Sequence, residues 1–207
     1  MSVMSVATQR TKRRQQREET RRQILDAAQE FLRERSFREL SVDALMANTG
    51  HTRTVFYRHF EDIPTMILAL ISQEGAELLD LARDWANTED VGPGVARARL
   101  TAFVDFHVRK GPIIHAVAEA AHHDEIVERA YHAMVEGFIA LTADAIQSRI
   151  DRGELQPLDA QQVARALVLM LNGYLIDVLG RGVSVDPDRV LDTVWTIWTR
   201  TLFPRAT

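Results

Sequence analysis

The chain has 207 residues, 46% of them hydrophobic, which is enough for one core of fair size or two smaller ones. It contains no cysteine, and this excludes disulfides, thiolate metal ligands and a cysteine nucleophile. The net charge of −4 hides a division, because residues 1–60 carry 12 Lys/Arg against 7 Asp/Glu whereas residues 61–207 carry 13 against 22, so that a basic head precedes an acidic body.

The N-terminal segment is the most strongly basic part of the chain. Residues 10–22 have the sequence RTKRRQQREETRR, with seven Arg or Lys against two Glu. Such a run is typical of a solvated disordered tail or of an arm that follows a nucleic-acid backbone. We therefore expect residues 1–19 to form a basic disordered arm, with Arg13 and Arg14 as candidate DNA contacts.

Apolar residues return every three or four positions along the rest of the chain, and this period predicts helices and no sheet. Ser41 and Thr52 can cap two short helices, and Thr20 followed by Gln23 resembles a capping box for the helix before them. We interpret the Gly-Pro pair at 111–112 as a stop between two helices. The full set is about nine helices, at residues 20–35, after Ser41, after Thr52, and at 64–85, 95–110, 112–122, 124–152, 159–180 and 187–203.

Two short helices joined by a turn at Gly50, with a longer helix before them, match the helix-turn-helix plan of DNA-binding proteins. The second short helix can turn its apolar side inward, which leaves hydroxyls and a guanidinium group for DNA. Arg can pair with guanine, Thr and Tyr suit phosphate oxygens, and backbone N–H groups at the start of the first short helix could meet a phosphate. The candidate contacts are Ser41, Val42, Thr52, Arg53, Thr54 and Tyr57.

The segment over residues 20–70 resembles the DNA-binding domain of the TetR family of repressors. The matching positions are Ala27-Ala28, Phe31, Ser41-Val42, Ala44, Gly50, Thr52 at the usual serine, Phe56-Tyr57 and His59-Phe60. The resemblance implies that Thr52, Arg53 and Thr54 approach bases and that Ser41, Tyr57 and His59 hold phosphates; Tyr57 could instead be partly core, and His59 could instead pack at the helix end. His51, Val55 and Ile63-Pro64 depart from the family pattern. Ile63-Pro64 replaces a lysine-acid pair that is usual in the family, so one expected phosphate contact, from the lysine, is in doubt.

Apolar stripes mark the last two predicted helices. They consist of Val163, Leu167, Met170, Leu171, Tyr174 and Val178, followed by Val190, Val194, Ile197 and Thr201. In the TetR family the last two helices pair across a two-fold axis into a four-helix bundle, so the resemblance implies a homodimer. Packing within one chain is the alternative.

The C-terminal part resembles the EthR subfamily, whose members hold long apolar ligands in a tunnel. The positions that match the tunnel lining are Tyr131, Phe138, Thr142, Val168, Asn172 and Trp198, and the helical pattern adds Trp85, Phe103 and Phe106. The resemblance implies a small hydrophobic effector. Aromatic residues at helical spacing can equally well be ordinary core.

Catalytic and metal-binding signals are weak. His115, Glu119 and His122 share one helix face, but no second histidine pair accompanies them, so a solvated polar face is the better interpretation. No nucleophile elbow, phosphate-binding glycine loop or dinucleotide fingerprint occurs. We expect no enzyme, no metal and no cofactor. The first nine residues lack the apolar stretch of a signal peptide, and no segment has roughly 18 to 20 uninterrupted apolar residues, so we expect a soluble cytoplasmic protein with no membrane partner.

Together these patterns predict an all-α protein. We expect the arm over 1–19, a three-helix helix-turn-helix domain over 20–63 and a ligand-binding and dimerisation bundle over 64–207. The predicted function is a repressor that leaves its operator DNA when a small apolar effector binds. Two alternatives stay open: a small helical enzyme or lipid-binding module that uses the same cavity, and a DNA-binding regulator without an effector.

Overall fold

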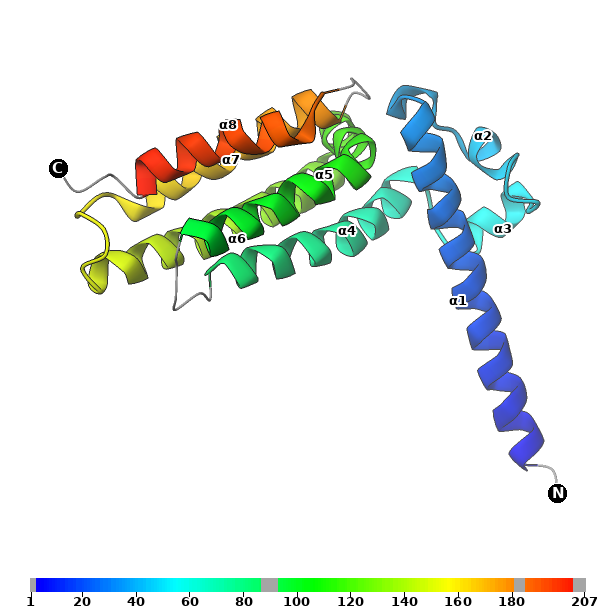
Figure 1. Ribbon diagram of the computed structural model, residues 1–207. Helices are drawn as coiled ribbons and strands as arrows, with labels where there is room; N and C mark the ends of the chain where they lie inside the picture. The colour runs from blue at the N-terminus through cyan, green and yellow to red at the C-terminus, as the bar shows by residue number, and fades with distance from the viewer. Residues whose placement is uncertain (1–2, 87–92, 181–184, 203–207) are drawn as a thin grey trace. The chain divides into compact units, whose positions relative to one another are not determined.

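The computed structural model describes residues 3–86, 93–180 and 185–202, and all regular structure in these ranges is helical (Figure 1). The predicted all-α class is therefore confirmed. The described residues hold eight α-helices and one short 3-10 helix. They are α1 Val3–Glu34, η1 Phe37–Glu39, α2 Val42–Met46, α3 Arg53–Tyr57, α4 Ile63–Ala86, α5 Pro93–Ala121, α6 Glu125–Asp151, α7 Ala160–Leu179 and α8 Pro187–Leu202.

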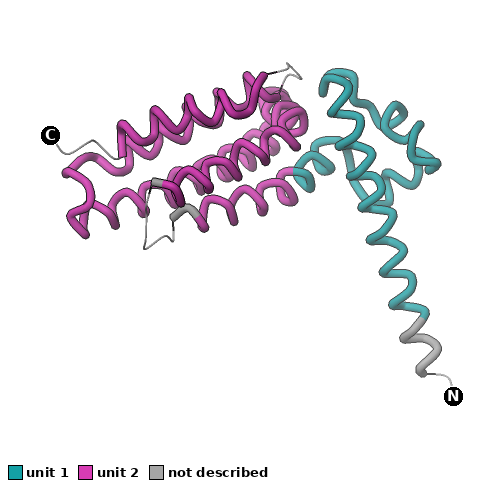
Figure 2. Tube along the Cα trace, in the orientation of Figure 1, with its two compact units in different colours: residues 1–70 teal, residues 71–207 magenta. Residues whose placement is uncertain are grey.

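The chain divides into two compact units, residues 1–70 and 71–207, called the N-terminal and C-terminal units below (Figure 2). The sequence suggested a boundary at residue 63, where α4 begins. The division falls after Leu70 instead, and the first turns of α4 belong to the N-terminal unit. Met66, Ile67 and Leu70 in these turns are fully buried. The buried part of the N-terminal unit therefore extends past the start of α4.

The expected disordered arm is helical, because α1 is continuous from Val3. Residues 1 and 2 lie outside the described residues. The arm is rich in Arg, Gln, Glu and Lys, which are good helix formers, and Glu19 pairs with Arg22 one turn later. Thr20 does not cap a helix, since its hydroxyl donates to the carbonyl of Gln16 inside α1. A dense run of charge was therefore an unreliable sign of disorder.

The predicted stop at Gly111 and Pro112 is also wrong, since α5 runs through both residues. A Cβ atom added to Gly111 would lie 2.6 Å from the carbonyl oxygen of Leu179 in α7. Glycine is needed here so that the two helix backbones can approach closely. The glycine that suggested a helix end is thus a packing residue.

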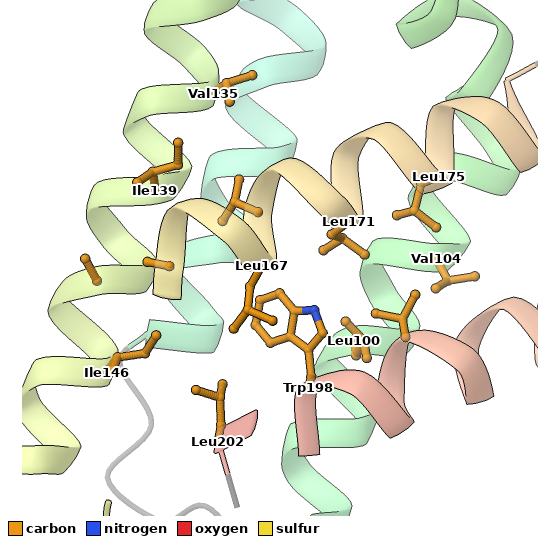
Figure 3. Packing of buried hydrophobic residues seen from close by; sticks show 14 of the residues in the cluster. Leu100, Val104, Val135, Ile139, Ile146, Leu167, Leu171, Leu175, Trp198 and Leu202 are labelled. Atoms are coloured by element: carbon orange, nitrogen blue, oxygen red, sulfur yellow. The ribbon is translucent and has the colours of Figure 1, made fainter. Parts of the chain in front are cut away.

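The C-terminal unit is a bundle in which α5 packs against α6, α7 and α8, and α6 packs against α7. Figure 3 shows the indole of Trp198 from α8 among Leu100 of α5 and Leu167 and Leu171 of α7. Side-chain oxygens of Asp124 and Asp159 cap α6 and α7. These caps fix where the long bundle helices begin.

By length and composition alone, α7 is the one helix among the described residues that could cross a membrane. Its buried residues join the core of the bundle, and Arg165 near its start makes two hydrogen bonds to the carboxylate of Glu136 in α6. One face of α7 therefore belongs to the core of the bundle.

The close approach of α5 to α7 gives a stability prediction. Gly111→Ala should lower the free energy of unfolding by about 1–3 kcal/mol, because the added methyl group forces the two backbones apart. Gly137→Ala in the middle of α6 is the matched control. Its Cβ would meet only Leu79 at an ordinary 3.6 Å, so the gain in helix propensity should leave stability equal or higher by up to about 1 kcal/mol. Urea denaturation followed by circular dichroism measures both, and equal stability of the two variants would contradict the proposed role of Gly111.

Candidate functional site

The helix-turn-helix segment is held by local hydrogen bonds. Ser41 caps α2, where its Oγ accepts a hydrogen bond of 3.1 Å from the backbone N–H of Ala44. Gly50 has a φ of +69°, in the left-handed region that glycine adopts without strain. The hydroxyl of Thr49 donates to the carbonyl of Met46 and accepts from the N–H of His51. These contacts set the direction in which the chain enters α3.

An aromatic anchor lies beneath α3, formed by Phe56 in the helix and Phe60 three residues after its end. Phe56 is fully buried and Phe60 almost so, and their ring centroids lie 5.6 Å apart. The guanidinium carbon of Arg21 in α1 lies 4.8 Å from the centre of the Phe60 ring. Together these contacts hold a helix of only five residues in place.

The outer face of α3 carries the predicted base-contacting residues. Thr52, Arg53 and Thr54 are exposed, and Tyr57 is 47% exposed. Thr52 occupies the N-cap position, but its hydroxyl makes no capping hydrogen bond. Tyr57 is therefore surface rather than core, and α3 presents hydroxyls and one guanidinium group to solvent.

Arg53 is held by two neighbours. Its Nη1 donates to Asp43 Oδ2 of α2 at 2.9 Å, and its Nη2 donates to the hydroxyl of Tyr57 at 3.1 Å. The guanidinium carbon also lies 5.5 Å from the centre of the Tyr57 ring. Sequence analysis did not single out Asp43, because residues ten positions apart on two different helices share no periodic signal.

The residues predicted to contact phosphates differ in their burial and in their existing hydrogen bonds. Ser41 already uses its oxygen to cap α2, and the side chain of Val42 is buried. His59 is half-buried, and its Nδ1 is buried and makes no hydrogen bond within the described residues. Burial, followed by the charges of Arg17 and Arg21, lowers the pKa of His59 below its ordinary value, so its ring is neutral at pH 7.

Three further residues of the N-terminal unit, Arg13, Arg14 and His51, were singled out from the sequence. Arg13 and Arg14 are exposed on α1, which fixes the spacing of the basic side chains along a helix. His51, which departs from the family pattern, lies with its Nε2 2.9 Å from Gln23 Oε1 of α1. This contact joins the turn before α3 to α1 and gives the unusual histidine a structural role.

The C-terminal unit contains an apolar cavity of about 40 Å³. Its lining is Ala82, Leu100, Phe103, Phe138, Thr142, Val168, Leu171 and Trp198. Five of these are predicted tunnel residues, namely Phe103, Phe138, Thr142, Val168 and Trp198. Sequence analysis missed Ala82, Leu100 and Leu171, although each lies one helical turn from a predicted tunnel residue and the spacing could have indicated them.

Three other predicted tunnel residues, Phe106, Tyr131 and Asn172, are not among the residues that line this cavity. Phe106 is fully buried in a separate cluster with Leu78 and Ile114. Asn172 Nδ2 donates a hydrogen bond of 2.8 Å to the hydroxyl of Tyr131, and burial raises the pKa of that tyrosine. The side chain of Trp85 lies outside the described residues.

The stripes on the last two helices mostly face the interior of the same chain. Leu167, Leu171, Val190 and Val194 are buried in the bundle core, so their assignment to a dimer surface is wrong. The exposed face of α7 instead carries Ala166, Leu169 and Gly173, and α8 adds Ile197. We call these four exposed small or apolar residues the α7/α8 face.

The two histidines that share a predicted helix face, His115 in α5 and His122 just after it, differ in their surroundings. His115 is half-buried, and the Nδ1 atom of the exposed His122 bonds the carbonyl of Ala118 within the same stretch of chain. Over residues 3–86, 93–180 and 185–202, no three His, Asp or Glu side chains gather in a way that could hold a metal ion.

Two family models match the chain. The model "Bacterial regulatory proteins, tetR family" matches residues 24–77, and the model "Transcriptional regulator EthR, C-terminal domain" matches residues 96–204. The second match alone covers more than half of the chain. The two matched ranges include the helix-turn-helix and nearly the whole bundle.

Solved structures of similar fold include transcription regulators. PfmR of Thermus thermophilus is 16% identical, with a TM-score of 0.70 over 90% of this chain and 96% of that one. GusR of Salmonella enterica is 20% identical, with a TM-score of 0.70 over 88% and 95%. The fatty acid degradation regulator FadR of Bacillus halodurans is 15% identical, with a TM-score of 0.66 over 86% and 93%. At these identities the likeness concerns the fold.

With its aromatic-anchored helix-turn-helix, its helical bundle and the two family matches, the chain belongs to the TetR family of bacterial transcriptional regulators, with a C-terminal domain of the EthR type.

Proposed function

We propose that this regulator is a cytoplasmic, homodimeric repressor that binds operator DNA through α3 and releases it when a small apolar molecule enters the cavity of the C-terminal unit. The observation that carries the proposal is the division of α3 into two faces. Phe56 is buried beneath the helix, whereas Arg53 and Tyr57 are exposed above it. A buried Arg53 or Tyr57 would have been incompatible with DNA recognition.

The outer face of α3 has the chemistry that major-groove recognition requires. Residues at the start of a recognition helix contact base edges, so Thr52, Arg53 and Thr54 are the proposed base contacts. Arg pairs with the O6 and N7 atoms of guanine. Tyr57 and His59 are the proposed phosphate contacts, joined by Ser41 and the backbone at Val42, and Arg13 and Arg14 of α1 add sequence-independent attraction to the DNA backbone.

Substitution of Tyr57 tests the DNA surface. Tyr57→Ala should weaken operator binding by about 10- to 100-fold, since an interfacial contact of this kind is worth roughly 1–3 kcal/mol. Tyr57→Phe keeps the ring but removes the hydroxyl that holds Arg53, and it should have a smaller effect. Gel-shift titration measures both, with sedimentation to verify that the oligomer is intact. Unchanged affinity of the alanine variant would remove Tyr57 from the DNA surface.

We further propose that the α7/α8 face is the dimer surface. Leu169 is 48% and Ile197 is 39% exposed, although both are large and apolar. A Cβ added to Gly173 would meet nothing within 4 Å, so this part of α7 is open enough for another helix to approach. Two recognition helices must also reach half-sites about 34–36 Å apart, which requires two copies of the chain.

Charge placed on the α7/α8 face tests the dimer. Leu169→Arg should produce monomers in sedimentation velocity, because two-fold symmetry would bury the new charge twice, at a cost of about 3–5 kcal/mol each time. Loss of the dimer should also lower the affinity for operator DNA. Ile126→Arg is the matched control, because Ile126 is 54% exposed on α6, a helix that contributes no residue to the proposed surface. A dimeric Leu169→Arg variant would place the interface elsewhere.

The cavity is suited to apolar ligands but is small. Thr142 supplies one hydroxyl, and the remaining lining is hydrocarbon and aromatic. Small-molecule sites usually have volumes of about 300–1,000 Å³, so a ligand must displace side chains such as Phe103 or Trp198 to enter a cavity of about 40 Å³. The Tyr131–Asn172 pair is the proposed polar partner for a ligand carbonyl or amide.

The proposed release of DNA uses α4. This helix has its first residues in the N-terminal unit, and Ala82 near its other end lines the cavity. Displacement of its C-terminal half by a ligand would therefore act on an element that both units share. Ligand and DNA would then oppose each other only to the extent that they favour different positions of α4.

Filling the cavity tests ligand control. Hydrophobic esters, amides and acyl thioesters should raise the melting temperature of the wild-type protein, with about 2.7 kcal/mol of stabilisation at a ligand concentration 100 times Kd. Val168→Phe should abolish this rise and make DNA binding insensitive to the same compounds. Val108→Phe, at an exposed position of α5, should preserve both responses.

If no compound raises the melting temperature or releases DNA, the regulator works without an effector of this class. A rise that persists in Val168→Phe would place the ligand outside this cavity.

A further inference from the structure

Asp43 is an acidic residue within the proposed DNA surface. It lies in the first turn of α2, and its side chain is 71% exposed beside that of Arg53, which is 58% exposed. A carboxylate at this place repels the phosphates of every duplex, so general attraction to DNA does not account for it. It forms an ion pair with the Arg53 guanidinium group, 2.9 Å away.

The contacts of Arg53 restrict the orientation of its planar group. Asp43 engages Nη1 from α2, and the Tyr57 hydroxyl engages Nη2 from the following turn of α3. Guanidinium has five N–H donors in a rigid fork, so donors are left for a base after these two bonds are made. A side chain that is already oriented loses less rotamer freedom when it binds.

We propose that Asp43 is a positioning residue that gives Arg53 its power to discriminate operator from other DNA, an inference that rests on the proposed function. The carboxylate lowers affinity for all duplexes by repulsion. It also holds the guanidinium fork in the orientation that suits a guanine edge, and this second effect favours the operator alone. Asp43 therefore lowers the affinity for DNA in general and raises the ratio of operator affinity to affinity for other DNA.

The test compares two DNA probes with the full-length protein. One is a duplex that the wild-type protein selects from a random-sequence pool, and the other is the unselected pool of the same length. Fluorescence anisotropy at fixed salt gives the affinity for each probe, and their ratio is the specificity. Asp43→Asn should bind the unselected pool more tightly and should lower the specificity by about two- to fivefold, the range expected for an exposed ion pair. Asp43→Glu should restore most of the specificity.

A double-mutant cycle separates positioning from simple charge. If Asp43 acts through Arg53, Asp43→Asn should leave the specificity unchanged in an Arg53→Ala background, although affinity for both probes still rises. Glu30→Gln, which breaks an exposed ion pair with Arg33 in α1, is the matched charge control and should leave specificity unaltered. Melting temperatures verify that each variant is folded. If Asp43→Asn does not fold, Asp43→Glu still tests the role of the carboxylate.

The outcomes are distinct. If the wild-type protein selects no sequence, the proposed function fails and this inference fails with it. If it selects an operator while Asp43→Asn keeps the full specificity, this result overturns only the role of Asp43. The same holds if Asp43→Asn lowers the specificity as much in the Arg53→Ala background as in the wild-type protein.

Discussion

The proposed DNA surface depends on the burial of the Phe56 side chain beneath α3. An isolated helix of five residues is far too short to form in water, because nucleation costs more than so few hydrogen bonds return. Phe56 and Phe60 supply the missing stability through tertiary packing, and Arg21 covers one of the two rings. Only because this inner face is fixed can Thr52, Arg53 and Thr54 on the outer face keep a defined direction.

Much of the fold could be predicted where the determining signal is local. The expected cap at Ser41 occurs, and the carboxylate of Asp159 caps α7 in the same way, because each side chain meets an N–H only three residues away. Local signals failed where tertiary packing decides the outcome. Gly111 suggested a helix end, yet it serves a close contact with Leu179, 68 residues further along the chain. The basic arm was mispredicted for a different and local reason, because its charge suggested disorder whereas its residue types support a helix.

The candidate site shows the same division. The periodicity of single helices, together with the family resemblance, named Phe103, Phe138 and Trp198, and the structure brings these three to one cavity. No periodic pattern could join Asp43 to Arg53 or Tyr131 to Asn172, because each pair joins two helices. Such pairs depend on how helices pack, and a single sequence shows only which face of each helix is apolar.

The size of the cavity sets a limit on how the proposed effector can act. A cavity of about 40 Å³ excludes most organic molecules, so the form that binds a ligand must be a more open one. If that form is a minor fraction of the free protein, the apparent affinity falls by the same fraction. Burial of apolar ligand surface, at roughly 25 cal/mol per Å², must offset the cost of opening before any energy is left to oppose DNA binding. Longer apolar ligands should therefore be stronger effectors, up to the length at which the opened cavity is filled.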